Sequence, residues 1–495
     1  MPCQLPVDCL NGIFEYLQED KAALRSCLLV NRLWCEVSVQ ILWTNIQNYN
    51  TLIACLPHES KEFLHKNEII ILAPTSKPPL FNYVAFIKSL SIKETNIKIE
   101  NLLKNHQPEM ATTSTITLPI SSNSSYIDKI TLVKQEIFKM FMNQISLKSL
   151  KFNDLICLSN ISFSNIPFIT YPGAIGCLRN LSELTCDTDI DSEFFCQMSQ
   201  ICHNLQSLKI IIRDIVSDGL TNLISFQQNL RYLYLSNFSE SGNWARIISS
   251  ITKLADNLIK LYIDGGEHFI SLSFIASFTN LQKLSLSSNH HEDFKTLQYV
   301  AFPQLQILKF KYQCPNHEYF NKFLEINGNN LKTIQLCNNL LNYYLLNNNL
   351  LNLAVAKFCP NLKSLFTLFY NDEIDTLKLI LISCQQLERI KVWYSDDNLN
   401  EDELLEVVAK YSPKTFRELE IVASPFSRPR SFLEGIETFF TSWSNHIPQK
   451  SLSLIIKDPQ NRFKVKKEIM EVIEEFQKLG IIKKFEMIHK FSLKF

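Results

Sequence analysis

The sequence predicts an α/β fold of the repeat type, a solenoid in which each repeat contributes one strand and one helix. One phrase, LxxLxL, returns along most of the chain. Its copies begin at residues 181, 205, 230, 258, 281, 305, 331, 362, 387 and 416. The intervals run from 23 to 31 residues, which is the spacing of a repeat array. We expect a strand in each phrase and a helix in each spacer.

Alternation inside the phrase is the reason to expect a strand. Leu233 and Leu235 fall on one side of an extended backbone, and Tyr232 and Tyr234 fall on the other. The spacers instead carry apolar residues at helical offsets, as in the stretch 192–202. One strand and one helix cannot bury their own apolar faces, but stacked neighbours can. The expected result is a horseshoe with its strands on the concave face.

The array is expected to extend beyond the clear copies. Residues 86–92 (FIKSLSI) and 145–152 (ISLKSLKF) are degenerate copies, and 450–457 (KSLSLIIK) is a further strand, followed by a helix and a closing strand. A Ser- and Thr-rich stretch near 107–128 is expected to be a mobile insertion. The predicted domains are an N-terminal helical module at 1–46, a linker with degenerate first repeats at 47–140, the solenoid at 141–457 and a C-terminal cap at 458–495.

The composition describes a folded protein with balanced charge. Of 495 residues, 49 are Lys or Arg and 49 are Asp or Glu. The sequence therefore lacks the excess of basic residues that is typical of nucleic-acid-binding proteins. No apolar run approaches the ~18–20 residues that cross a bilayer, so we expect no membrane partner. The 14 cysteines are scattered without a CxxC pair. That pattern predicts reduced thiols and a cytoplasmic or nuclear location.

Residues 5–43 carry more large apolar side chains than three short helices enclose. Asp8, Asp20 and Asn31 are the expected N-caps of these helices. A segment of about 40 residues rarely forms a self-sufficient core. The surplus apolar surface therefore predicts a partner molecule.

The repeats resemble the leucine-rich-repeat family. Cys202, Cys359 and Cys384 each stand three residues before the first leucine of a repeat, in CHNL, CPNL and CQQL. This placement is similar to that of the cysteine-containing subclass of the family. We expect each thiol to be a small buried side chain at the corner between helix and strand.

The N-terminal residues resemble the F-box. The motif's landmarks follow in order: LP at 5–6, IF at 13–14, YL at 16–17, LLV at 28–30, NRLW at 31–34 and LW at 42–43. The family usually has Val-Cys where this chain has Leu29-Val30-Asn31. The resemblance implies docking on a Skp-type adaptor and, through it, on the cullin and RING subunits of an SCF ubiquitin ligase. The residues that it implies as adaptor-facing or adaptor-supporting are Leu5, Pro6, Ile13, Phe14, Leu17, Leu28 and Trp34.

The sequence shows no enzymatic motif. It lacks GxxxxGK[ST], GxGxxG, HExxH and GxSxG. The adjacent Cys202 and His203 fall at the end of a predicted repeat helix, which favours a core role over a nucleophilic one. We expect no catalytic residue, no cofactor and no metal site, and the F-box resemblance implies that the chemistry belongs to another subunit.

The outward strand positions are predicted to form a basic and aromatic face. The residues expected to contact a target there are Lys209, Tyr232, Tyr234, Lys260, Tyr262, Lys283, Lys309, Lys391 and Trp393. Acids stand at the outer repeats instead, as at Glu183, Glu418 and Glu420. The hypothesis is that this face binds an acidic or phosphorylated segment of a protein. Exposed strand positions are commonly polar, so a face without a ligand is the other interpretation.

Two functions stay open at this point. The first is a non-catalytic substrate-recognition subunit of an SCF-type E3 ubiquitin ligase, with the F-box on the Skp adaptor and the repeats on a target protein. The second is a leucine-rich-repeat scaffold whose N-terminal helices recruit no ligase. A hydrolase is disfavoured because its motifs are missing.

Overall fold

The computed structural model describes residues 5–69, 79–106, 121–152, 168–213, 216–237, 244–266, 271–288, 291–311, 313–336, 348–369, 373–394, 401–423, 430–431, 435–445, 451–458, 460–461 and 463–489. The chain divides into two compact units. Unit 1 comprises Met1–Arg231 with Asn243–Leu254, and unit 2 comprises Tyr232–Gly242 with Ala255–Phe495. The domain boundaries proposed from the sequence stay predictions.

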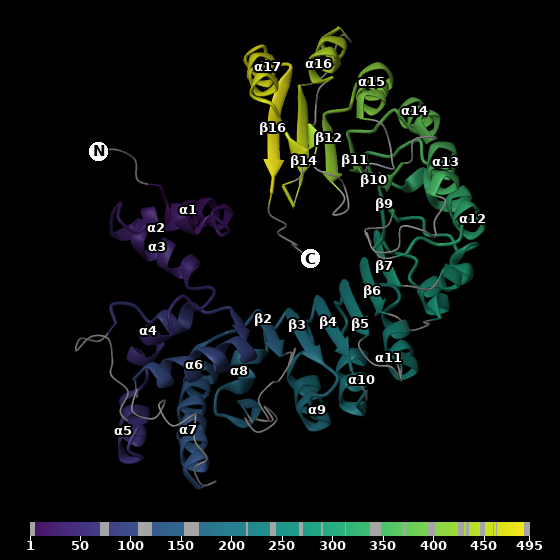
Figure 1. Ribbon diagram of the computed structural model, residues 1–495. Coiled ribbons are helices and arrows are strands. Elements are labelled where there is room, and N and C mark those ends of the chain that lie inside the picture. Colours follow the sequence, from purple (N-terminus) through teal and green to yellow (C-terminus); the bar gives the residue numbers. More distant parts are fainter. Residues whose placement is uncertain are drawn as a thin grey trace. The chain divides into compact units, whose positions relative to one another are not determined.

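Three short helices open unit 1 (Figure 1): α1 at Val7–Tyr16, α2 at Lys21–Cys27 and α3 at Arg32–Leu42. The predicted N-cap at Asp8 is wrong. Helix α1 starts at Val7, directly after Pro6. Asp8 therefore lies in the first turn, where its negative charge favours the helix without capping it.

The other two predicted caps are confirmed. The side-chain oxygen of Asp20 accepts a hydrogen bond of 2.9 Å from the N–H of Ala23 at the start of α2. Asn31 does the same for the N–H of Trp34 at the start of α3, also at 2.9 Å. Each cap satisfies one of the N–H groups that a first helical turn leaves unpaired.

Unit 1 continues with parallel strands that pair in sequence order. Their register aligns Leu90, Leu150, Leu184 and Leu208, and each of these leucines is at most 2% exposed. Aligned apolar residues thus form one continuous core row, as expected for stacked repeats. The strands are β1 at Ser89–Ser91, β2 at Ser149–Phe152, β3 at Glu183–Asp187 and β4 at Ser207–Ile212. The remaining helices are α4 at Tyr49–Ala54, α5 at His58–Lys66, η1 at Tyr83–Phe86, α6 at Ile92–His106, α7 at Ser121–Gln144, η4 at Phe168–Thr170, α8 at Ala174–Leu178, α9 at Ser192–Ile201, α10 at Asp218–Ser225, α11 at Trp244–Ile251 and η5 at Thr252–Leu254.

The insertion expected near 107–128 is only partly described. Residues 107–120 lie outside the described residues, whereas the stretch from Ser121 onward belongs to helix α7. That helix buries Val133, Phe138 and Phe141 completely. The buried residues in the later turns of α7 stabilise this helix, although it begins inside the polar stretch.

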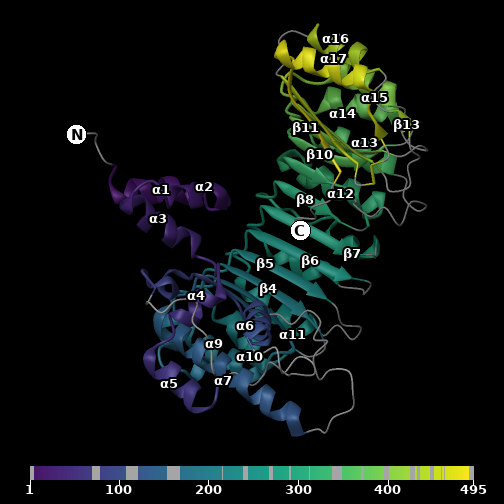
Figure 2. The ribbon, with the colours of Figure 1, turned by 60° about the vertical axis from the view of Figure 1, so that its left-hand side comes forward.

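Unit 2 contains a longer ladder of parallel strands, and Figure 2 shows β5, β6, β7 and β8 side by side. The strand register aligns Leu233, Leu261, Leu284 and Leu308 in one row, and all four leucines are fully buried. The strands are β5 at Tyr232–Asn237, β6 at Lys260–Gly266, β7 at Lys283–Ser288, β8 at Ile307–Phe310, β9 at Thr333–Gln335, β10 at Ser364–Leu368, β11 at Arg389–Tyr394, β12 at Glu418–Ala423, β14 at Leu452–Lys457 and β16 at Ile482–Ile488, with a separate small pair of β13 at Arg430–Ser431 and β15 at Phe463–Lys464.

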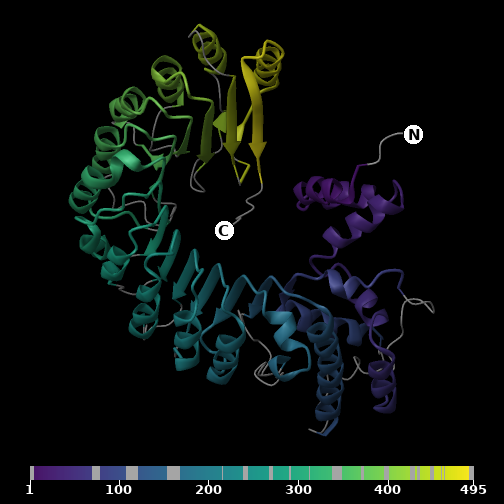
Figure 3. The same ribbon diagram turned by 180° about the vertical axis from the view of Figure 1, so that it is seen from behind.

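The helices of unit 2 cover one side of this ladder and leave the other side to the strands, as seen in Figures 1 and 3. They are η6 at Leu272–Ser277, η7 at His291–Leu297, α12 at His317–Asn327, η8 at Gly328–Asn330, α13 at Asn348–Phe358, α14 at Ile374–Ser383, α15 at Glu401–Tyr411, α16 at Ile436–Ser444 and α17 at Lys467–Lys478. Each predicted phrase has thus become one parallel strand, which confirms the α/β repeat-solenoid fold class.

Two spacers differ from the expected α-helix. The repeats that begin at residues 258 and 281 fold their spacers as the 3₁₀ helices η6 and η7. These repeats are among the shortest in the array. A 3₁₀ helix rises ~2.0 Å per residue against ~1.5 Å for an α-helix, so fewer residues span the helical layer.

The corner cysteines are buried as predicted. Cys202, Cys359 and Cys384 have no exposed surface. The Cys202 thiol donates to the carbonyl of Leu178 at 3.4 Å, and the Cys384 thiol donates to the carbonyl of Cys359 at 3.3 Å. Each donor reaches a residue 24 or 25 positions earlier, so the thiols join consecutive repeats.

Two amide side chains take the same corner where no cysteine stands. Gln227 donates to the carbonyl of Cys202 at 2.7 Å and accepts from the N–H of Leu205 at 3.0 Å. Asn327 donates to the carbonyl of Val300 at 2.9 Å and accepts from the N–H of Phe302 at 2.7 Å. Both amides are about 1% exposed. Neither was predicted from the sequence, although both fall at the same corner of their repeats.

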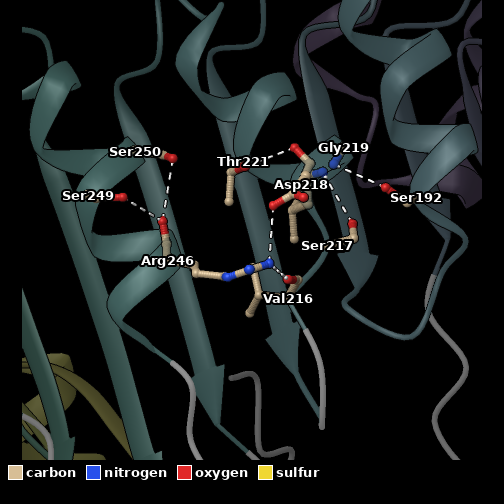
Figure 4. A network of polar contacts seen from close by, with 10 residues as sticks. Ser192, Val216, Ser217, Asp218, Gly219, Thr221, Arg246, Ser249 and Ser250 are labelled. Carbon is tan, nitrogen blue, oxygen red and sulfur yellow. Dashed lines mark hydrogen bonds and ion pairs between the residues drawn. The ribbon is translucent and has the colours of Figure 1, made fainter.

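A polar network holds neighbouring repeat helices of unit 1 together, as Figure 4 shows. The Gly219 N–H donates to Ser192 Oγ at 3.2 Å. A Cβ at Gly219 would lie 2.1 Å from the Ser192 carbonyl oxygen, so only glycine permits this approach. Arg246 donates to Asp218 at 3.1 Å, but both side chains are largely exposed and the pair contributes little.

Candidate protein-interaction surfaces

The first candidate surface lies on α1, on the residue Leu5 that precedes it, and on the turn between α2 and α3. Six large apolar residues there are exposed, and we call them the N-terminal apolar surface: Leu5, Val7, Ile13, Tyr16, Leu29 and Val30. Leu29 is 89% exposed and Ile13 is 48% exposed. Single exposed leucines are normal, whereas six large exposed apolar residues within the segment 5–30 make this segment a candidate interaction site.

The F-box residues named from the sequence divide into two groups. Leu5, Pro6 and Ile13 are exposed. Phe14 is buried at 1% and meets the Trp34 ring edge to face, with 5.1 Å between centroids. Phe14 therefore packs inside the helical segment, which fits the supporting role among those implied by the resemblance. The residues that are partly buried are Leu17, Leu28 and Trp34.

Four members of the N-terminal apolar surface were not predicted from the sequence as contact residues: Val7, Tyr16, Leu29 and Val30. A signal for two of them was present. Three consecutive apolar residues at 28–30 cannot all face the interior of one turn. Trp43, by contrast, belongs to the core of unit 1, where its ring lies 4.5 Å from that of Tyr83.

The second candidate surface lies on the strand side of unit 2. We call it the lysine–tyrosine face and define it as Tyr232, Tyr234, Lys260, Tyr262, Lys283 and Lys309. The register pairs Tyr232 with Lys260 and Lys260 with Lys283 in one row. It pairs Tyr234 with Tyr262 in the next row, which continues through Ser285 to Lys309. All six side chains are partly exposed, so this part of the predicted target-binding set is brought together.

Lysines and rings interdigitate on this face. The Lys260 ammonium lies 4.5 Å from the centre of the Tyr232 ring, and the Lys283 ammonium lies 4.7 Å from the centre of the Tyr262 ring. Such cation–π contacts fix the direction of otherwise flexible side chains. The lysines are therefore held against the sheet.

The face carries positive charge that nearby acids do not neutralise. Within the described part of the chain, no carboxylate lies within 4.0 Å of the ammonium groups of Lys260, Lys283 or Lys309. Burial lowers the pKa of Lys309, and the charges of Lys283, Lys311 and Lys391 lower it further. Burial and the charge of Lys260 lower the pKa of Lys283 in the same way. In both shifts burial is the larger cause, and repulsion from neighbouring lysines acts in the same direction.

At the other end of the ladder, lysine side chains are paired with a carboxylate. Lys391 and Lys457 each lie 2.8 Å from the same carboxylate oxygen of Glu420. The prediction that Trp393 offers a contact surface is corrected by the structure. Trp393 is only 7% exposed because it packs against Phe366 and Val422 in a buried cluster.

Lys209 lies on β4 in unit 1, where it is partly exposed and pairs in register with Thr185. It belongs to a different unit from the lysine–tyrosine face and is not assigned to that face.

The thiols of the repeats are poor nucleophiles. Burial raises the pKa of Cys202 and of Cys384 to about 12, and burial raises the pKa of Cys359 in the same direction. A thiol in this state stays protonated at neutral pH. Ten of the described cysteines are free. The expectation of reduced thiols fails at Cys314, which is disulfide-bonded.

Metal centres and membrane spans are the remaining kinds of site to consider. Across the described ranges, no group of three or more His, Cys, Asp or Glu side chains is arranged to hold a metal ion. No helix in the described part of the chain is both long and apolar enough to cross a membrane.

Comparison with known proteins gives weak likenesses. No protein-family model matches the sequence, and no curated protein matches it. Among solved structures, the chain is similar to one from the yeast Rad7–Elc1 complex, at 13% identity and a TM-score of 0.38, over 80% of this chain and 89% of that chain. It is also similar to the leucine-rich repeat-containing protein LegL7 from Legionella pneumophila, at 15% identity and a TM-score of 0.36, over 63% of this chain and 94% of that chain. Neither likeness assigns a function.

Proposed function

We propose that this protein is the substrate-recognition subunit of an SCF-type E3 ubiquitin ligase. Its N-terminal helices dock on a Skp-type adaptor, and its repeats bind the protein to be modified. The protein itself is non-catalytic and acts in the cytoplasm or nucleus. The observation that carries the proposal is the N-terminal apolar surface, on the same helices that bear the F-box landmarks.

Physical chemistry supports an apolar partner for these helices. Moving apolar surface out of water is favourable by about 25 cal/mol per Å² of surface buried. Leu29 and Tyr16 are each about nine-tenths exposed, so burying them under a partner would recover most of that term. Helices that present apolar anchors to a groove are a recurrent mode of recognition.

The test is adaptor binding by the full chain. Purified protein is titrated with a Skp-type adaptor by calorimetry, beside the double variant Ile13→Asp/Leu29→Asp. We expect the variant to lose at least a hundredfold in affinity, because each new carboxylate would be buried without a counter-charge.

A matched control comes from two apolar residues exposed elsewhere in unit 1. Ile175 and Phe226 are each 58% exposed. The variant Ile175→Asp/Phe226→Asp therefore also replaces two exposed apolar side chains with carboxylates. This control should bind the adaptor normally. Wild-type protein that folds but does not bind the adaptor would favour the scaffold that recruits no ligase.

A further inference from the structure

We propose that the lysine–tyrosine face binds an extended segment of its target through several aspartate or glutamate side chains. This inference rests on the proposed function, because it specifies the class of target that the repeats receive. It depends on three features: the unneutralised charge, the spread of the lysines over neighbouring strands, and the state of the tyrosine rings.

The charge is the first feature. Lys260, Lys283 and Lys309 stand on three consecutive strands, β6, β7 and β8. None has a carboxylate partner within 4.0 Å among the residues that the structure describes. A folded protein gains nothing in stability from like charges gathered on a half-buried surface. A ligand that supplies the missing negative charge relieves this repulsion.

The spread of the lysines indicates several anionic groups in a row. Adjacent strands lie ~4.8 Å apart, and successive residues of an extended peptide rise ~3.3 Å. Lysines on three neighbouring strands therefore match carboxylates distributed along a short extended segment. A single phosphate is usually held by converging, bidentate arginines, and the six residues of this face include no arginine.

The tyrosine rings argue against nucleic acid. Single-stranded RNA and DNA bind by stacking bases on open aromatic faces. On this surface the Tyr232 ring carries the Lys260 ammonium and the Tyr262 ring carries the Lys283 ammonium. One face of each of these two rings is therefore occupied by a cation. The rings position the lysines, and the lysines are left to pair with an acidic chain.

The experiment measures binding of defined probes to the full chain. The main probe is a fluorescein-labelled peptide of twelve residues with six glutamates, and its partner has glutamine at the same six places. We expect the glutamate peptide to bind at least tenfold tighter, and its affinity to fall as salt rises from 50 to 200 mM.

Variants locate the effect. Lys283→Glu/Lys309→Glu should lose at least tenfold in affinity for the glutamate peptide, and the neutral pair Lys283→Gln/Lys309→Gln should lose part of it. The control Lys322→Glu/Lys357→Glu makes the same change in net charge on the exposed helix side of unit 2. It should bind the peptide as wild type does, apart from a small long-range effect.

Three outcomes would overturn the inference. The first is unchanged glutamate-peptide binding in the Lys283→Glu/Lys309→Glu variant. The second is tighter binding of a uridine dodecamer than of the glutamate peptide. The third is equal binding of a glutamine peptide with one phosphoserine, since one anionic group would then suffice. Adaptor titration on the same preparations is independent: normal adaptor binding with no peptide binding overturns this inference alone, and the reverse overturns the proposed function.

Discussion

The N-terminal segment and the repeat ladder differ in how far they bury their large apolar side chains. In the ladder, Leu233, Leu261 and Leu284 occupy one register row and are fully buried. In the N-terminal segment that forms α1, α2 and α3, Leu5, Ile13 and Leu29 remain exposed. The ladder buries its apolar side chains between neighbouring repeats, whereas the N-terminal segment leaves these three side chains exposed. Stability therefore resides in the ladder, and the capacity to bind a second molecule by apolar contact resides in the helices.

The largest effect should come from the ladder. Leu284→Ala removes a fully buried side chain, and such changes cost ~2–5 kcal/mol of unfolding free energy. Leu29→Ala is the same substitution on the N-terminal apolar surface and should stay within ~0.5 kcal/mol. Urea unfolding followed by circular dichroism measures both. Equal losses for the two variants would contradict the comparison.

A pair of glycines sharpens the same contrast. Gly219→Ala forces a Cβ against the Ser192 carbonyl and should destabilise unit 1 by ~1–3 kcal/mol. Gly12 lies in α1, and a Cβ added there would have no other atom within 4 Å. Gly12→Ala should therefore stabilise that helix by up to ~1 kcal/mol. Thermal melts of the two variants should move in opposite directions.

The buried corner amide is expected to have a smaller effect. Gln227→Leu keeps the volume but leaves the Leu205 N–H and the Cys202 carbonyl without their partner. Orphaned groups cost ~1–3 kcal/mol, but the apolar replacement offsets much of that cost, so we expect a net loss of ~1 kcal/mol. The control Gln200→Leu alters an exposed glutamine in α9 and should leave the urea midpoint unchanged. A neutral result at Gln227 would mean that water or a rearranged backbone satisfies these groups.

The smallest expected effect is a gain in stability on the lysine–tyrosine face. The pKa of Lys309 is lowered in the folded state by burial and by neighbouring lysines. The protonated form therefore opposes folding below that pKa, and the penalty disappears as pH rises past the ordinary lysine pKa of 10.5. Lys309→Met should stabilise the protein by up to ~0.5 kcal/mol at pH 7 and by less at pH 11.

Lys357→Met on the exposed side of α13 is the control for that gain, and it should leave the melting temperature unchanged at both pH values. A loss of stability in Lys309→Met at pH 7 would show that the lysine is favourable where it stands.

The sequence predicted the ladder because strand phrases carry a period of two and recur at a repeat length. It predicted the corner position of Cys202 and Cys384 for the same reason. It did not predict the burial of Trp393, which depends on Phe366 and Val422 in neighbouring strands. Local alternation places Trp393 on the outward side but says nothing about the size of its neighbours across the register.

The candidate surfaces were predictable to different degrees. The lysines and tyrosines could be assigned to one face from strand alternation alone, but their cation–π pairing depends on register and rotamer. In the N-terminal segment, the F-box landmarks included Ile13, which is exposed. They did not separate buried Phe14 from exposed Tyr16, because that distinction depends on how three short helices pack on one another.

Hydrogen exchange of the full chain with and without a Skp-type adaptor tests the central claim most directly. Amides of α1, α2 and α3 should exchange at least tenfold more slowly when the adaptor is bound, while those of β5 to β12 keep their rates. Unchanged exchange in the three helices at saturating adaptor would contradict the account.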